Sequence, residues 1–314
     1  MAELKILFAA TELGSLVGVG GLGQVVASLA SVLKKNGQDI RIALPFYRLI
    51  HNINDLEPPE LIWQGKIPFY ETHSSVRVYS TAILIQHTLL PVFLIAGHPW
   101  FEQADSPERI YSPDNQPEPY FFFSAALLAF LDRYRSWTPH VIHCHDYHTG
   151  LVSIYLKTLY HSKINRRKVA TVLTIHNLGY QGITDINLLG RVGLASSLGA
   201  YSPDLHGMEF YGKLNCMKGS IIYANLTCTV SKTYAKEIMT PQQGKGLEGV
   251  LKAIQDSNRL KYILNGIDTE YWDPAKLYGS LSYNANDLSG KKLAKKTLQK
   301  HMGLELCDHP LISV

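Results

Sequence analysis

The first residues with the types and spacing to bind a ligand form a glycine cluster near the N-terminus. Gly18, Gly20, Gly21 and Gly23 follow an apolar run over 4–10 and precede a helical pattern over 24–35. Glycines let a ligand approach the backbone closely, and the unpaired N–H groups and dipole at a helix start attract anions. The cluster therefore predicts a loop that faces a phosphate or a sugar.

The cluster also satisfies the G-x-G-x-x-G pattern of dinucleotide-binding folds, but its context differs. Residues 11–17 separate the first glycine from the strand, and the next strand, over 39–45, carries its acid, Asp39, at the wrong end. The fingerprint requires a tight turn after the strand and an acid at the far end of the next one. We expect no nicotinamide, flavin or other cofactor.

Polar residues follow two further candidate strands. His145, Asp146 and His148 come after the strand over 140–143, and His176 comes after the strand over 169–175. The histidines lack an H-x-x-x-H or cysteine partner at ligand spacing, so we expect no metal site, and we interpret His143 as satisfying backbone groups. In open α/β sheets ligands bind at the carboxyl ends of strands. We therefore expect Asp146 and His176 to hold sugar hydroxyls beneath the glycine loop.

Apolar runs rich in strand-forming residues alternate with helical patterns from end to end, which predicts a parallel sheet covered by helices on both faces. The expected strands are 4–10, 40–45, 76–85, 91–96, 140–143, 169–175, 226–230 and 262–264, and the expected helices are 24–35, 120–135, 150–160, 218–223, 232–239, 247–255 and 288–301. Segments 101–119 and 194–212 are too long for ordinary connections and are expected to be functional or mobile loops.

The composition argues against several partner classes. The 314 residues carry a formal net charge of only +4 with no run of five basic residues, so we do not expect nucleic acid binding. The apolar run over 121–131 is too short to span a bilayer, and we expect no membrane association. The four cysteines, 144, 216, 228 and 307, have no C-x-x-C spacing, and no leader is evident, so we expect reduced thiols in the cytoplasm.

Seven motifs, in this order and spacing, resemble the bacterial glycogen synthase and plant starch synthase family. The motifs are GGL at 20–22, LPFY at 44–47, HCHDYH at 143–148, TIHNLGYQG at 174–182, VSKTYA at 230–235, GLEG at 246–249 and LNGID at 264–268. The family is a group of glucosyltransferases that move glucose from ADP-glucose to the non-reducing end of an α-1,4-glucan with retention of configuration. The resemblance implies a Rossmann-like doubly wound domain, the N-terminal half of a two-domain glycosyltransferase fold.

The resemblance also assigns site residues by matching positions. On the donor side it implies that Gly20 and Gly21 approach the phosphates and sugar, that His176 bonds the transferred glucose, and that Asn265 contacts the donor glucose. It places Asp146 in the sugar region of the cleft, and Glu12, Tyr147 and Asn177 on the acceptor side.

Three positions depart from the family pattern. Gly18 stands where the family has a lysine that reaches the donor, Gln24 replaces an acid, and Tyr147 replaces a tryptophan. Losing one charge-assisted hydrogen bond to a phosphate costs roughly 1.5 to 3 kcal/mol. We therefore expect a weakened donor site.

Residues 1–305 are interpreted as the N-terminal catalytic domain, and 306–314 as a linker and the start of a second, nucleotide-sugar-binding domain. Without that domain's clamp on the diphosphate, we expect little glucose transfer by this chain alone. A C-terminal synthase domain acting in trans is one expected partner. The alternative is a non-catalytic glucan-binding or regulatory module derived from the same family.

Overall fold

The computed structural model describes residues 3–14, 16–52, 56–70, 72–111, 116–160, 169–194, 207–269, 272–277 and 279–312. Its contacts divide the chain into two compact units, Met1–Asn265 and Gly266–Val314. This division does not coincide with the expected boundary at 305, and the assignment of 1–305 to one catalytic domain stays a prediction.

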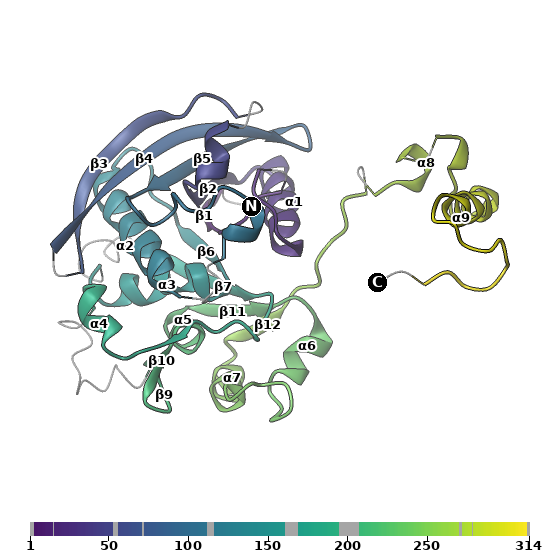
Figure 1. The fold of residues 1–314 in the computed structure, drawn as a ribbon. Helices are drawn as coiled ribbons and strands as arrows, with labels where there is room; N and C mark the ends of the chain where they lie inside the picture. The colour runs from purple at the N-terminus through teal and green to yellow at the C-terminus, as the bar shows by residue number, and fades with distance from the viewer. Residues whose placement is uncertain are drawn as a thin grey trace. The chain divides into compact units, whose positions relative to one another are not determined.

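A nine-stranded sheet forms the centre of the first unit (Figure 1). Its order is β12 (Leu260–Tyr262), β11 (Leu226–Thr229), β7 (Ala170–Ile175), β6 (Val141–His145), β1 (Lys5–Ala9), β2 (Asp39–Pro45), β5 (Thr88–Ala96), β4 (Thr72–Ile85) and β3 (Glu60–Phe69). Every pairing from β12 to β5 is parallel, whereas β4 and β3 pair antiparallel. The expected mostly parallel sheet is confirmed.

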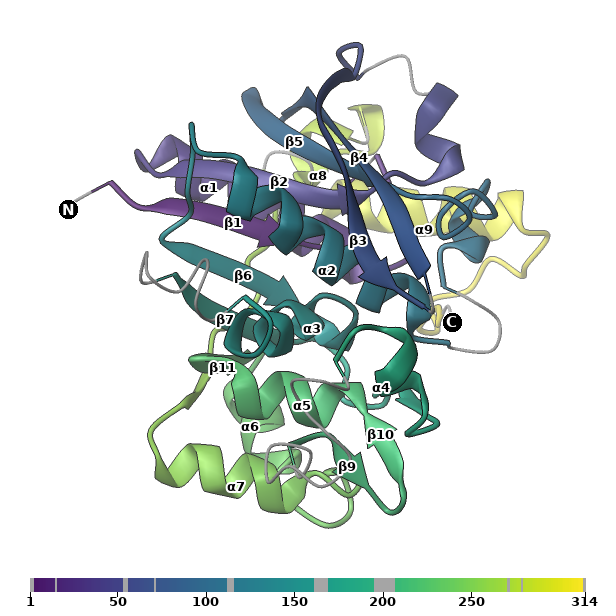
Figure 2. The same cartoon turned by 90° about the vertical axis from the view of Figure 1, so that its left-hand side faces the viewer.

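Helices cover both faces of this sheet. α1 (Gly21–Lys35) lies on one face, and α2 (Glu118–Arg133) and α3 (Asp146–Lys157) lie on the other (Figures 1 and 2). α5 (Cys216–Tyr223) packs against α3, while α6 (Lys232–Glu237) and α7 (Glu248–Asp256) pack near β12. The apolar run at 121–131 is the buried α2, and among the described residues no helix has the length and apolarity to cross a membrane.

Several elements differ from the sequence prediction. β3 was not predicted, because its alternation is interrupted by Gly65 and Pro68. The last strand of the sheet ends at Tyr262 and not at Leu264. α1 begins at Gly21, so the glycine cluster extends into the helix; a Cβ on Gly23 would lie 3.1 Å from the Gly14 nitrogen and 3.2 Å from the Val17 oxygen.

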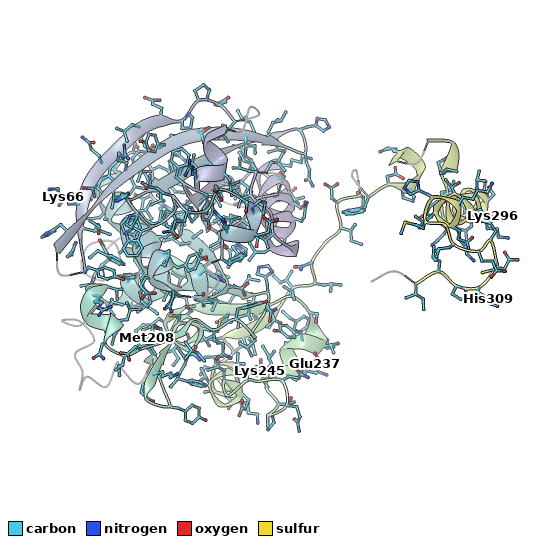
Figure 3. The ribbon with its side chains drawn as sticks, in the orientation of Figure 1. Lys66, Met208, Glu237, Lys245, Lys296 and His309 are labelled. Atoms are coloured by element: carbon cyan, nitrogen blue, oxygen red, sulfur yellow. The ribbon has the colours of Figure 1, made fainter. Side chains whose placement is uncertain are left out.

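The two expected long loops contain short elements. The segment 194–212 contains β9 (Glu209–Phe210), which pairs with β10 (Lys213–Asn215) in a three-stranded sheet that β8 (Ile183–Thr184) completes. A four-residue helix, α4 (Leu188–Arg191), precedes the segment. Met208, labelled in Figure 3, is buried beside this sheet. The segment 101–119 contains a 3-10 turn, Pro107–Arg109. Residues 195–206 and 112–115 lie outside the described part of the chain.

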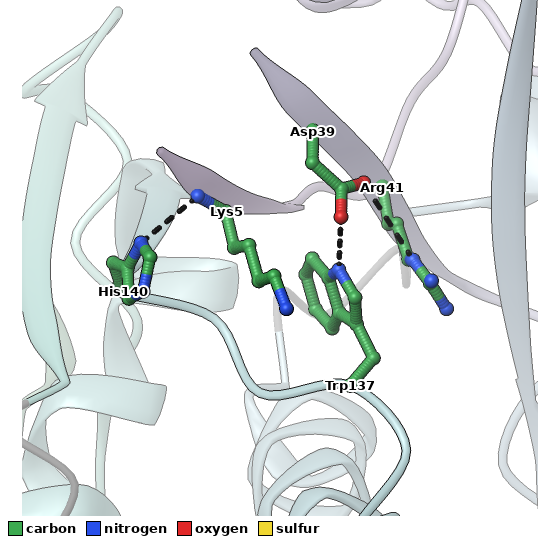
Figure 4. Close-up of polar contacts among 5 residues, drawn as sticks. All are labelled: Lys5, Asp39, Arg41, Trp137 and His140. Atoms are coloured by element: carbon green, nitrogen blue, oxygen red, sulfur yellow. Dashed lines mark hydrogen bonds and ion pairs between the residues drawn. The ribbon is translucent and has the colours of Figure 1, made fainter. Parts of the chain in front are cut away.

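Side-chain contacts fix the amino ends of the central strands (Figure 4). The Lys5 N–H donates to His140 Nδ1 at 3.1 Å, and the Trp137 indole N–H donates to Asp39 Oδ2 at 2.6 Å. The Arg41 guanidinium lies 4.5 Å from the Trp137 ring centroid. Asp39 is the acid at the wrong end of its strand for a dinucleotide site. It therefore has a structural role at the amino ends of the strands, whereas the glycine loop follows the carboxyl end of β1.

The second unit is small and mostly exposed. It contains α8 (Pro274–Leu277) and α9 (Ser289–His301), and among its described residues only Gly290 and Gln299 are buried. The Gln299 amide donates to the carbonyls of Glu305, at 3.0 Å, and Cys307, at 3.2 Å. These bonds hold the segment that follows α9 against the helix.

Candidate functional site

A cavity of about 320 Å³ lies at the carboxyl ends of β1, β6 and β7, beside the start of α1. β1 has β2 on one side and β6 on the other, so the strand order reverses at this point, where open α/β sheets bind ligands. The cavity is lined by Glu12, Val19, Gly20, Gly21, Leu22, Tyr111, Asp146, His148, His176, Asn177 and Tyr180. The fold thus brings together six of the predicted site residues: Glu12, Gly20, Gly21, Asp146, His176 and Asn177.

Glu12 holds the glycine loop in place. Its Oε2 accepts the N–H groups of Val19, at 2.9 Å, and Gly20, at 3.1 Å, and its Oε1 accepts the Tyr111 hydroxyl at 2.5 Å. Two N–H groups that the sequence pattern offered to a phosphate are therefore already bonded to a carboxylate of the chain itself.

The start of α1, next to the N–H groups that Glu12 binds, has open space around it. Gly20 is the residue before α1 and Gly21 its first residue, and a Cβ on either would have no atom within 4 Å. The N–H groups of Gly21 and Leu22 donate no hydrogen bond to any residue that the structure describes. These two donors and the space above them are what a ligand can use.

Gly18 lies apart from this cavity. It borders a neighbouring hollow with Gly14, Val17 and Gln24, and a Cβ at Gly18 would lie 2.9 Å from the Gly14 carbonyl oxygen. Real Cβ atoms do not approach a backbone oxygen that closely. A lysine at position 18 therefore requires the loop to move.

Asp146 joins the ends of β6 and β7. Its φ of 53° is in the left-handed region, which aspartate tolerates better than most residues but at some cost in strain. Its Oδ1 accepts the N–H groups of His176, at 2.8 Å, and Asn177, at 3.2 Å. Burial raises the pKa of this carboxyl from 3.8 to about 7, against the lowering effect of those two bonds. Near neutral pH, Asp146 can therefore either accept or donate a hydrogen bond.

A row of imidazoles leads from the cavity into the sheet. His145 Nδ1 lies 3.0 Å from His176 Nε2, and the rings of His143 and His145 stack with centroids 4.4 Å apart. His143 Nε2 lies 2.7 Å from the Thr174 hydroxyl, so the expectation that His143 satisfies backbone groups is wrong. Burial lowers the pKa of both His143 and His176 to about 4, so these rings are neutral at pH 7.

The structure places Tyr147 and His148 differently from the sequence expectation. Tyr147 is 1% exposed and packs against Tyr120 and against His148, which lines the cavity, but Tyr147 does not line the cavity itself. His148, which was not predicted as a site residue, lines the cavity together with Tyr111 and Tyr180. The helix was predicted to begin at Gly150; a start at Asp146 would have placed His148 in its first turn. Tyr111 lies in an irregular segment and gives no periodic signal.

The structure also shows where the predicted site residues Asn177 and Asn265 lie. The Asn177 Oδ1 accepts the Gly179 N–H at 2.8 Å, which shapes the loop after β7. Asn265 is exposed in the segment after β12 and does not line the cavity. Within the described part of the chain, no group of three or more histidines, cysteines and acids is arranged to hold a metal ion.

Comparison with known proteins gives one consistent result. Residues 5–253 match the family model described as the starch synthase catalytic domain. The chain belongs to this family. The glycogen synthase of Pseudothermotoga lettingae is 35% identical over 99% of this chain, and glycogen synthase 2 of Geobacter sulfurreducens is 38% identical over 99%. Each alignment covers 62% of the relative.

The fold comparison agrees with the sequence comparisons. The catalytic domain of starch synthase IV from Arabidopsis thaliana, solved bound to ADP and acarbose, superposes with a TM-score of 0.82 and 30% identity. The match covers 98% of this chain and 61% of that one. The α/β starch synthase fold is therefore shown, and this chain spans about three fifths of the length of the relatives it matches.

Proposed function

We propose that this chain is the N-terminal part of a retaining glucosyltransferase that moves glucose from ADP-glucose to the non-reducing end of an α-1,4-glucan. The observation that carries the proposal is the convergence of an open helix start, Asp146 and His176 on one cavity at the strand-order switch. Family membership supplies the reaction.

The donor phosphates belong at the start of α1 in this proposal. Gly20 and Gly21 leave room for them, and the N–H groups of Gly21 and Leu22 can donate at the positive end of the helix dipole. Gly18 supplies no charge there. Phosphate binding by this part of the chain therefore relies on backbone donors and on a C-terminal synthase domain.

His176, Asp146 and Asn177 serve the sugar in this proposal. The neutral His176 ring is held by its contact with His145, and so presents a fixed hydrogen-bonding edge to the transferred glucose. Asp146 accepts sugar hydroxyls and keeps His176 and Asn177 in place through their N–H groups. Glu12 and Asn177 face the acceptor side. Asn265 and Tyr147, which do not line the cavity, keep their family roles only as proposals, as does a cytoplasmic location.

The test is transfer of labelled glucose from ADP-glucose to glycogen, by this chain alone and mixed with the C-terminal portion of Geobacter sulfurreducens glycogen synthase 2 that has no counterpart here. We expect turnover in the mixture and little with the chain alone. Because a methyl group on Gly21 projects into the open space, Gly21→Ala should reduce turnover in the mixture at least tenfold.

A matched control is Gly249→Ala. Gly249 lies in the first turn of α7, and a Cβ there also has no atom within 4 Å, but it lies outside the cavity. This variant should match the effect of Gly21→Ala on unfolding while leaving turnover unchanged. Glycogen binding without transfer in every folded mixture would refute the enzymatic proposal and support the non-catalytic glucan-binding module.

A further inference from the structure

A second and larger cavity, of about 690 Å³, opens among the residues that follow β2 and β5 and those that begin α2. Its lining combines buried aromatic residues, Tyr47, Phe101 and Tyr120, with exposed polar residues such as Gln103 and Gln116. None of its lining residues belongs to the candidate site described above.

Three residues that line this cavity carry a buried polar atom without a hydrogen-bond partner in the described structure. These atoms are the Tyr47 hydroxyl, the Trp100 indole nitrogen and Glu118 Oε2. Buried polar groups in folded proteins are nearly always paired, so three around one cavity need an explanation. The Trp100 N–H is a donor, the Glu118 oxygen is an acceptor and the Tyr47 hydroxyl can be either. This combination matches a ligand with hydroxyl groups.

The charges around the cavity favour a neutral ligand. The Arg109 guanidinium is paired with Asp105 at 3.3 Å, and Glu102 Oε2 lies 2.8 Å from His98 Nδ1. The lining thus carries both signs of charge, with Arg48 and Arg109 set against Glu102, Asp105 and Glu118. Among the described lining residues the cations are only Arg48 and Arg109, and no group of acids there is arranged to hold a metal ion.

Aromatic rings are a further feature of this second cavity. The Tyr70 and Trp100 rings lie 5.5 Å apart at an interplanar angle of 31°, and Trp100 stacks on Phe122 at 5.7 Å. Tyr70 is 37% exposed, which leaves ring surface for a ligand. Aromatic rings beside hydroxyl-binding groups bury the apolar face of a pyranose while the polar atoms bind its edge.

We propose that this cavity is a second carbohydrate site, which binds a neutral α-1,4-glucan segment outside the transfer site. The choice of α-glucan rests on the proposed function. The two cavities share a wall: the Tyr120 ring lies 4.6 Å from the His148 ring of the candidate site, and the Tyr120 hydroxyl donates to Ile110, the neighbour of Tyr111. The second site thus retains a glucan chain next to the transfer site.

The test follows the Trp100 indole N–H by ¹H–¹⁵N NMR of the full chain during titration with maltoheptaose. The four tryptophans give four indole signals, and Trp100→Phe identifies the one of interest. We expect a saturable shift of this signal with maltoheptaose and none with ADP or cellohexaose. Tyr47→Phe and Glu118→Ala should each weaken this binding event about tenfold, because each removes one buried hydrogen-bonding atom while keeping the Trp100 signal. The control Trp272→Phe, in the second unit, should leave it unchanged.

A variant of the other cavity separates this inference from the proposed function. In Gly21→Ala the maltoheptaose shift of Trp100 should persist with the same affinity, even if transfer fails in every mixture. An unmoved Trp100 signal at saturating maltoheptaose overturns the second site, whatever the transfer assay shows. A shift produced by ADP in place of the sugar, or one abolished by Gly21→Ala, overturns it as well.

Discussion

Asp146 combines burial, left-handed backbone and two backbone hydrogen bonds in one residue. Its carboxyl pKa of about 7 means that the native state holds a proton which the unfolded state, with an ordinary pKa of 3.8, releases. Between these values the folded state binds more protons, so this residue lowers stability as the pH rises from about 4 to about 7, and the cost then levels off. The site therefore keeps a destabilising group where a sugar is proposed to bind.

Asp146→Asn tests this at the residue scale. Asparagine also tolerates positive φ and can accept the N–H groups of His176 and Asn177, but it carries no charge. We expect the variant to gain stability relative to the native chain as the pH rises, by up to roughly 4 kcal/mol above pH 7, because one pKa unit is worth about 1.4 kcal/mol.

Urea unfolding at pH 4 to 8.5 measures this difference, with the exposed Asp256→Asn on α7 as the control. If Asp146→Asn instead lost the same amount of stability at every pH, the buried charge of Asp146 would not be what destabilises the native chain.

At the scale of elements, β6, α3 and the residue after β7 carry four histidines, of which His145 and His148 are buried and His143 and His176 are half-buried. Burial lowers the pKa of His143 and His176 to about 4 and that of His148 to about 3, and it also lowers the pKa of His145. Below about pH 6.5 the unfolded chain protonates these rings while the folded chain does not. Stability therefore falls on acidification from about pH 6.5 to 4, and the four histidines outweigh the opposite effect of Asp146.

His148→Phe should reduce this acid sensitivity. The ring lies among Tyr111, Tyr120 and Tyr147, and its Nδ1 is buried without a partner, so a phenyl ring suits the space. The slope of unfolding free energy against pH, between about pH 6 and 4.5, should decrease by about 1.4 kcal/mol per unit, which corresponds to one proton. The exposed His301→Phe is the control, and an unchanged slope in His148→Phe would contradict the explanation.

The sequence predicted the helices and strands whose hydrophobic pattern is continuous. It did not predict features that depend on contacts between residues distant in the chain. The strands β1, β6 and β7 and the polar residues after them were predicted, because the parallel-sheet pattern alone places those ends together. The occupation of the Val19 and Gly20 N–H groups by Glu12 was not predicted, since it depends on how a loop folds back. The burial of the Tyr147 side chain was not predicted, because the start of α3 sets which side chain faces the core.

At the scale of the whole molecule, the buried hydrophobic core ends at Leu260, and the chain continues as the mostly exposed segment 263–269 into the second unit. In that segment Leu264 is 76% exposed and Ile267 is 75% exposed. The second unit has almost no buried residues among those described, so its own stability must be small. Stability should therefore differ widely between the two units.

Limited digestion and truncation test this difference together. Chymotrypsin should cut first within 263–269 or in the second unit, and leave a resistant fragment that ends near Asn265. A chain that ends at Asn265 should unfold cooperatively within about 3 °C of the full chain, because it retains every residue of the buried core. A much lower Tm, or initial cleavage within the nine-stranded sheet, would show that residues 266–314 complete the fold of the first unit and do not form a separate one.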